Sequence, residues 1–177
     1  MIANRSFTSQ ISADESKQSL KRFRRNFLFS IVGILLVILI VYIISPVAII
    51  GIRTTESVPG YVFLIIKNRM PMRDDYVAFM PPPNKYYKNI RFIKYLGGMP
   101  GDKVTQEGRH FFINGKYIGY AKETAMSGDS LEVSGSGVIP EKKYFVRGTH
   151  PDSFDSRYKD IGLIDEKNIL GTAYRIF

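Results

Sequence analysis

A serine in the segment RTTESVPGYVF is the first candidate for chemistry. Pro59 restricts the chain and Gly60 lets it bend, so Ser57 can stand on an exposed turn. A serine hydroxyl becomes an effective nucleophile when a base removes its proton. Thr55 could lend its hydroxyl to an oxyanion hole beside the Ser57 backbone N–H. The competing interpretation is an ordinary turn residue, since serine beside proline and glycine is common in turns.

Lys94, in the stretch IRFIKYL, is the candidate base. Alternate residues of a strand share a face, so Lys94 is expected to point with Phe92 and Leu96. Burial on that apolar face disfavours the charged ammonium and lowers its pKa from about 10.4. A drop to roughly 7–8 would give a general base at neutral pH. A lysine that extends its ammonium into solvent past the apolar stem is the alternative.

A third polar group lies in the segment GTHPDSFDSRYKDIG, where Ser153, Asp155 and Arg157 alternate. Asp155 and Arg157 could form an ion pair, with Ser153 contributing a hydroxyl, although such pairs are more often structural than catalytic. The chain has no cysteine, and its histidines, His110 and His150, lack metal-ligand spacing. These observations exclude disulfides and argue against a zinc enzyme.

Short runs of aromatic and β-branched residues predict strands after the first third of the chain. The predicted strands are residues 61–66, 76–79, 90–96, 110–113, 116–120 and 143–147. Asn114-Gly115 predicts a type I′ hairpin turn, which needs positive φ at both central residues. The polar residues 126–137 predict a surface loop. The pattern indicates one mainly β, antiparallel domain.

Residues 27–52 carry no charge and supply the roughly 20 apolar residues that a transmembrane helix needs. Pro46 should end the regular helix, so residues 47–52 are expected to continue as an apolar strand. Residues 1–26 hold six basic and two acidic side chains and predict a flexible basic tail on the cytoplasmic side. Residues 53–177 are then expected outside the membrane.

Two other interpretations of this N-terminal pattern are less favoured. A cleavable signal peptide is an alternative, but the apolar run exceeds the usual length and no small-x-small cleavage site follows it. The formal net charge of +9 could suggest nucleic acid, but about half of the excess lies beside the apolar run. No nucleic-acid partner is therefore expected.

Taken in order, these motifs resemble those of the signal peptidase I superfamily of Ser/Lys peptidases. An apolar anchor is followed by TTESVP, by a D-x-V-x-F strand that starts at Asp75, by FIKYLGGMPGDKV and by an S-x-D-S-R-Y block. The resemblance implies a single N-terminal transmembrane helix, an antiparallel β-sheet catalytic domain and no metal or organic cofactor. It also implies roles for single residues: Ser57 as nucleophile, Lys94 as general base, Thr55 with the Ser57 N–H as oxyanion hole, and Ser153, Asp155 and Arg157 as supports of the lysine.

Two departures point to a branch of this superfamily. General leader peptidases usually place proline three residues after the nucleophile, whereas Pro59 comes two after Ser57, and Gly148-Thr149-His150 replaces their G-D-N. The Thr-x-Ser-x-Pro spelling is more similar to the TraF-type conjugative-transfer peptidases, which are associated with pilin maturation and in some members join the pilin ends.

The resemblance therefore implies a serine endopeptidase of the bacterial inner membrane with a periplasmic catalytic domain. Its expected partners are the lipid bilayer and an exported protein precursor, with a conjugative pilin preferred. The same acyl-enzyme permits hydrolysis or head-to-tail cyclisation, and the sequence does not choose between them. Two alternatives stay open: a general signal peptidase that acts on many exported proteins, and a non-catalytic, membrane-anchored assembly module.

Overall fold

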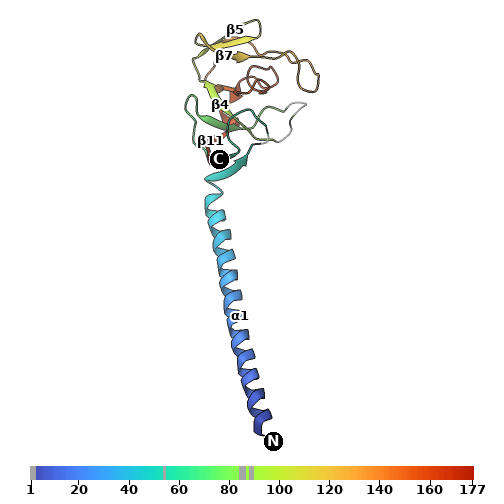
Figure 1. Ribbon diagram of the computed structural model, residues 1–177. Coiled ribbons are helices and arrows are strands. Elements are labelled where there is room, and N and C mark those ends of the chain that lie inside the picture. The colour runs from blue at the N-terminus through green and yellow to red at the C-terminus, as the bar shows by residue number, and fades with distance from the viewer. Residues whose placement is uncertain (1–2, 54, 84–86, 88–89) are drawn as a thin grey trace. The chain divides into compact units, whose positions relative to one another are not determined.

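The computed structural model describes residues 3–53, 55–83, 87 and 90–177, with helix side chains from Leu20 onward (Figure 1). The chain divides into two compact units, Met1–Pro46 and Val47–Phe177. The first unit holds one helix, α1 (Ala3–Ile44). Its part Leu20–Ile44 has a mean hydropathy of 3.2 and is long and apolar enough to cross a membrane. At a rise of about 1.5 Å per residue, this part spans more than the roughly 30 Å hydrocarbon core.

The boundaries of the helix differ from those expected from the sequence. Residues 3–26 continue α1 instead of forming an irregular tail; residues 1 and 2 lie outside the described part. This stretch contains no glycine or proline, so an established helix extends through it at little cost. At the other end, β1 (Ala48–Ile52) belongs to the second unit, as its expected strand character requires. The domain boundary therefore falls after Pro46, which stops the helix, and not after residue 52.

The second unit is mainly β and contains two antiparallel sheets. The larger sheet has the order β1-β2-β11-β3-β4-β9-β10, and the smaller has the order β7-β6-β5-β8. Besides β1, the larger sheet contains β2 (Val62–Lys67), β3 (Tyr76–Phe79), β4 (Phe92–Gly98), β9 (Lys143–Arg147), β10 (Ile164–Asp165) and β11 (Ile169–Arg175). The smaller contains β5 (Lys103–Glu107), β6 (His110–Ile113), β7 (Lys116–Tyr120) and β8 (Gly137–Val138). A 3-10 turn, η1 (Glu166–Asn168), precedes β11.

All six predicted strands are present, four of them with the predicted bounds. The β6–β7 hairpin turns at Asn114 and Gly115, whose φ angles of 50° and 79° confirm the predicted positive values. The strand around Lys94 begins two residues later than predicted and continues to Gly98. The sequence analysis did not predict β5, β8, β10 or β11 as strands. Their stretches are short or polar, or, in β11, combine glycine and threonine with few aromatic residues.

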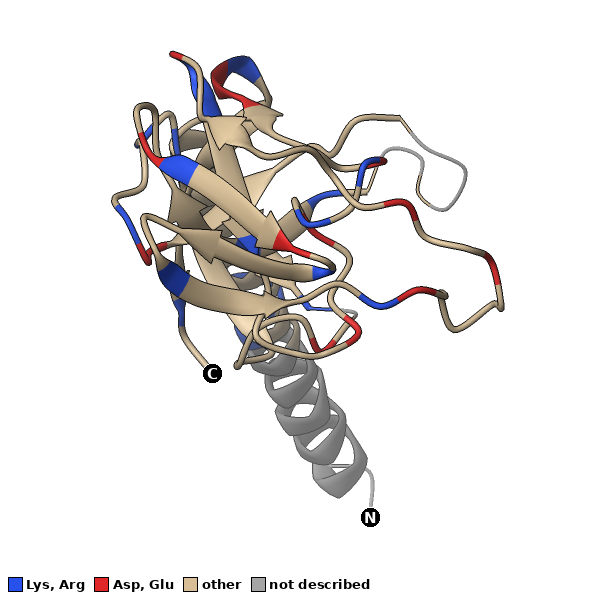
Figure 2. Ribbon diagram, turned by 90° about the horizontal axis from the view of Figure 1, so that it is seen from above, with Lys and Arg blue, Asp and Glu red and all other residues tan. Residues whose placement is uncertain are grey.

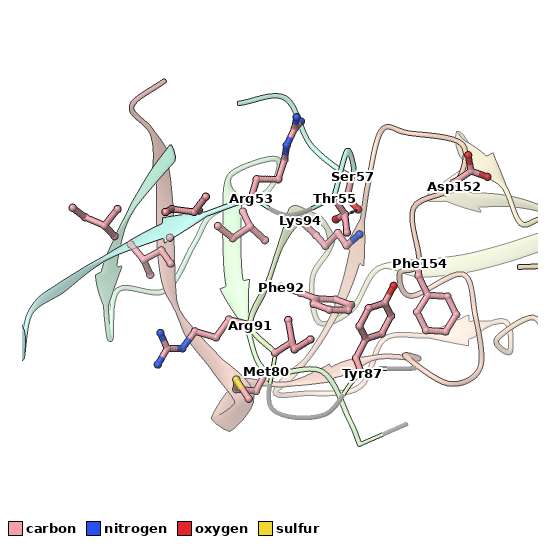
Figure 3. A pocket seen from close by; sticks show the side chains of 16 residues that line it. Arg53, Thr55, Ser57, Met80, Tyr87, Arg91, Phe92, Lys94, Asp152 and Phe154 are labelled. Carbon is pink, nitrogen blue, oxygen red and sulfur yellow. Dashed lines mark hydrogen bonds between the residues drawn. The ribbon is translucent and has the colours of Figure 1, made fainter. Parts of the chain in front are cut away.

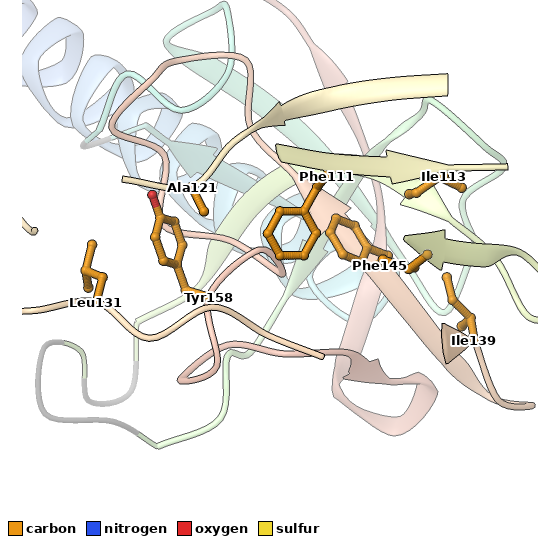
Figure 4. Packing of buried hydrophobic residues seen from close by; sticks show 8 residues of the cluster. Phe111, Ile113, Ala121, Leu131, Ile139, Phe145 and Tyr158 are labelled. Atoms are coloured by element: carbon orange, nitrogen blue, oxygen red, sulfur yellow. The ribbon is translucent and has the colours of Figure 1, made fainter. Parts of the chain in front are cut away.

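Apolar side chains from both sheets form the core that holds these strands. Phe111 of β6 and Phe145 of β9 pack with their ring centroids 6.3 Å apart and join the smaller sheet to the larger one (Figure 4). A second cluster surrounds Leu96 of β4, which is fully buried. The strand that carries Lys94 is thus fixed by packing as well as by its pairing with β3 and β9. Along the chain of this unit, acidic and basic positions are interspersed in strands and loops (Figure 2).

Candidate functional site

Ser57 lies in the connection between β1 and β2, and three neighbouring contacts fix this connection. The Thr149 backbone N–H donates to the Ser57 carbonyl at 2.9 Å, and an Arg53 guanidinium N–H donates to the Val58 carbonyl at 2.6 Å. Val58 is 1% exposed and belongs to the core cluster of β2. Ser57 itself is buried, and its Oγ lies 3.2 Å from the Thr55 hydroxyl. The sequence predicted an exposed turn, but Ser57 is buried on a turn that these contacts hold in place, and it lines a cavity.

Lys94 occupies the buried face of β4, as the alternation of the strand predicts, with 3% of its surface exposed. Its ammonium donates a hydrogen bond of 2.8 Å to the Ser153 hydroxyl and lies 5.5 Å from the centre of the Phe92 ring. Burial lowers the Lys94 pKa to about 8; the charge of Asp155 opposes this shift and the charge of Arg157 adds to it. A usable fraction of Lys94 is therefore neutral near physiological pH.

The Ser153 hydroxyl is held in place by a buried ion pair. Asp155 is fully buried and accepts two side-chain hydrogen bonds from Arg157, at 2.8 Å from Nε and 2.9 Å from Nη2. The same carboxylate accepts the Gly148 N–H at 2.7 Å. Arg157 also donates to the carbonyls of Ser153, at 3.2 Å, and Tyr120, at 2.6 Å. The ion pair is thus present, and it fixes the loop that carries Ser153 against β7 and β9.

Gly148 permits the close approach of the Ser57 and Ser153 segments. A Cβ atom there would lie 1.9 Å from the Ser153 Oγ and 2.7 Å from the Ser57 carbonyl oxygen. No side chain fits at these distances, and the obstacle on one side is backbone. The sequence analysis did not identify Gly148 as part of the site. Its only sequence signal was its place at the head of the terminal polar block.

Two more residues that the sequence analysis missed stabilise the same region. The Ser156 hydroxyl, fully buried, accepts the Val146 N–H at 2.9 Å and ties the terminal block to β9. Arg53 stacks over the Tyr61 ring at 4.4 Å while it binds the Val58 carbonyl. Neither role has a local sequence signature, because each depends on a partner brought close by the fold.

A cavity of about 540 Å³ contains the central part of this arrangement. Figure 3 shows the Lys94 ammonium directed toward Thr55 and Ser57 within it. The six residues singled out from the sequence come together here, three on the cavity wall and three directly behind it. The wall residues are Thr55, Ser57 and Lys94, and those behind are Ser153, Asp155 and Arg157.

Two unpaired backbone edges border the cavity. Among the described strands, β1 pairs only with β2, so its other edge is open. The first half of β4, from Phe92 to Lys94, pairs with β3 but lies before the first residue that pairs with β9. Isoleucine side chains lie between these edges: Ile50, Ile52, Ile65 and Ile93 all line the cavity. An extended peptide could add backbone hydrogen bonds along such edges.

No group of three potential metal-ligating side chains (His, Cys, Asp or Glu) occurs in the part of the chain that the structure describes. The chemistry that the described site itself supports is nucleophilic attack by a hydroxyl beside a buried amine.

A comparison with protein-family models matches residues 22–177 to "Signal peptidase, peptidase S26". The chain belongs to the peptidase S26 signal peptidase family. Signal peptidase I of Bacillus licheniformis is 37% identical over 98 residues, which cover 51% of this chain and 52% of that protein. Signal peptidase I T of Bacillus subtilis (strain 168) is 35% identical over 96 residues, or 50% of this chain and 49% of that protein. The chain thus spans about half the length of the curated relatives it matches.

Among solved structures, a signal peptidase I from Enterococcus faecalis is 26% identical, with coverage of 59% of this chain and 97% of that one and a TM-score of 0.39. The family model places the chain in the signal peptidase family, and neither it nor the curated relatives separate the branches of the family.

Proposed function

We propose that this family member is a Ser/Lys endopeptidase that removes a signal segment from exported protein precursors. The observation that carries the proposal is the environment of Lys94: a buried amine with a pKa of about 8, oriented by Ser153 and directed into the cavity that Ser57 lines. A lysine with no catalytic purpose would seldom be held this way, because its burial costs stability.

The proposed reaction is acyl transfer. Neutral Lys94 accepts the Ser57 hydroxyl proton on Nζ while Oγ attacks the scissile carbonyl carbon. The Ser57 N–H and the Thr55 hydroxyl stabilise the resulting oxyanion. The tetrahedral intermediate expels the downstream amine, which takes the proton from the Lys94 ammonium, and leaves an acyl group on Ser57. Water, deprotonated by Lys94, then releases the upstream product and restores the serine.

Ser153, Asp155 and Arg157 act through Lys94 and do not touch the substrate. Ser153 accepts a hydrogen bond from Nζ and so limits the positions that the flexible lysine side chain can adopt. The ion pair behind it keeps the loop of residues 153–157 rigid. Such fixed positioning lowers the entropy cost of reaching the reactive geometry.

The shape of the cavity supports a peptide substrate in an extended conformation. Such a peptide can lie between the open edge of β1 and the first half of β4, with main-chain hydrogen bonds to one or both. The isoleucines between those edges suit small apolar side chains just upstream of the cleaved bond. A signal segment supplies such small apolar side chains at its end next to the cleaved bond.

Helix α1 supports a membrane location for the reaction. Leu20–Ile44 is apolar enough to span a bilayer, and four basic residues lie between positions 21 and 25. Basic residues flanking a span stay on the cytoplasmic side, so the β domain would lie outside the cytoplasm, at the bacterial inner membrane. Anchoring there raises the effective concentration of substrates that emerge from the same membrane.

General signal peptidase activity is the first candidate, since the relatives reported above are named signal peptidase I. Maturation of a conjugative pilin is the second candidate. The observation that favours it is the motif TTESVP, in which Pro59 comes two residues after Ser57. Both candidates use the same acyl-enzyme. Cyclisation would follow if the substrate's own N-terminal amine, in place of water, attacked that intermediate.

The test is incubation of wild-type, Ser57→Ala and Lys94→Ala proteins with a general export precursor and with a pilin precursor. Ser136→Ala and Lys103→Ala, both exposed and outside the cavity, are the matched controls. Products are measured by intact mass. We expect wild type and controls to cleave and the two site variants to be inactive; a product lighter by one further water indicates cyclisation. Normal cleavage by either site variant would refute the assigned dyad.

A further inference from the structure

A second cavity, of about 250 Å³, lies next to the candidate active site. Three residues line both cavities: Tyr87, Asp152 and Phe154. The remaining wall comes largely from the β7–β8 connection, including Thr124, Ser127 and other residues between 122 and 131. A peptide that occupies the first cavity and passes these shared residues therefore enters the second.

Ser57 lies between two sides of the first cavity. In Figure 3, Ser57 and Lys94 separate the side of the cavity that holds Arg53 and Arg91 from the side that holds Asp152 and Phe154. Isoleucines of β1 and β4 also line the first cavity: Ile50, Ile52 and Ile93. The second cavity is of mixed polarity, because Ala125, Met126, Leu131 and Tyr158 line it together with Lys122, Thr124 and Ser127.

We propose that the second cavity binds the substrate segment immediately downstream of the cleaved bond. The proposal rests on the proposed function above. An exported precursor is apolar upstream of its cleavage site and has the mixed polarity of a soluble protein downstream. Matching polarity places the upstream part along the isoleucines and the downstream part between Asp152 and the β7–β8 connection. Residues downstream of the cleaved bond then contribute to substrate selection.

The wall of the second cavity is preformed. Phe154 stacks on Tyr158 with ring centroids 5.3 Å apart, and the Tyr158 hydroxyl accepts the Lys122 N–H at 3.0 Å. The Lys122 ammonium pairs with the Asp152 carboxylate, and the Asp152 N–H donates to His150 at 3.1 Å. A peptide would therefore bind to an ordered wall, without the entropy cost of fixing a mobile one.

The experiment compares two substrates that share the same upstream sequence in the full-length wild-type protein. One ends one residue after the cleaved bond, and the other extends six residues beyond it. We expect the longer substrate to have a kcat/KM about tenfold higher, because remote binding energy lowers the barrier of the chemical step. Ser127→Trp, which places a large ring at the second cavity, should reduce the longer substrate to the rate of the shorter one and leave the shorter one unchanged.

Ser136→Trp is the matched control, because Ser136 is also an exposed serine, lies later in the same connection and lines a different cavity. It should retain the length dependence, and melting temperatures should show that both variants are folded. Equal rates for the two substrates in wild type, or equal loss in both tryptophan variants, would overturn this inference alone. No cleavage of either substrate by wild type would overturn the proposed function, and the inference with it.

Discussion

The dependence of activity on pH is the sharpest test of Lys94 as the base. Burial lowers its pKa from 10.5 to about 8, and the lysine must be neutral to accept a proton from Ser57. Log kcat/KM should therefore rise with a slope of one below pH 8 and level off above it. At pH 6, two units below this pKa, we expect about 1% of the plateau value, and at pH 7 about 10%.

The lowered pKa of Lys94 also makes the free energy of unfolding depend on pH. The folded-state pKa of Lys94 lies below the unfolded-state value, so between about pH 8 and 10.5 the unfolded chain binds more protons. The free energy of unfolding should therefore rise with pH across this window; below pH 8 the full penalty of the buried charge applies. A difference of 2.5 pKa units corresponds to about 3 kcal/mol. Most of it, about 2 to 3 kcal/mol, should be regained between pH 7 and pH 10.

Lys94→Met isolates the contribution of Lys94 from those of other titrating groups, because it retains most of the side-chain length without the charge. The difference in unfolding free energy between this variant and wild type, from urea titrations in detergent, should fall by about 2 to 3 kcal/mol from pH 7 to pH 10. The peptidase assay uses the same pH series, with samples returned to pH 8 to check for irreversible loss. Lys103→Ala should keep the rise of log kcat/KM below pH 8. A rise centred near pH 10 instead, or a log kcat/KM that does not change from pH 6 to 9, would refute the role of Lys94.

Three further substitutions test the framework of the site. Gly148→Ala would place a Cβ 1.9 Å from the Ser153 Oγ, so we expect a lower melting temperature and a loss of kcat beyond tenfold. Asp155→Asn leaves the Arg157 charge buried without its partner and should cost about 3 to 5 kcal/mol in chemical denaturation; unchanged stability would contradict the structure. Thr55→Val should lower kcat by about 10²-fold, with little change in KM or melting temperature, if its hydroxyl stabilises the oxyanion. A change confined to KM would argue instead for substrate contact.

The local parts of this molecule were predictable from sequence. Asn114-Gly115 determines its own turn, because few other residues accept positive φ at both positions. The face of β4 that carries Lys94 follows from strand alternation, although alternation left open whether the ammonium reaches solvent, and the structure shows that Lys94 is buried. Both features depend on neighbours within a few positions.

The parts that depend on distant partners were not predictable in the same way. β11 is composed of residues with mixed preferences, and its place between β2 and β3 becomes evident only from pairing across 90 or more positions. The role of Gly148 likewise depends on two segments that meet only in the folded domain. The second cavity could not be predicted, because its wall joins the β7–β8 connection to the terminal polar block.

The central position of β11 also determines when the larger sheet can assemble. β11 is the last strand in the sequence, yet it separates β2 from β3, so the larger sheet cannot close until residues 169–175 have been synthesised. Contacts of such long sequence separation form late and slowly. During synthesis, Ser57 leaves the ribosome well before β11, the strand that joins β2 to β3. Under the proposed mechanism, this order of strands keeps Ser57 apart from Lys94 until the whole domain has been made.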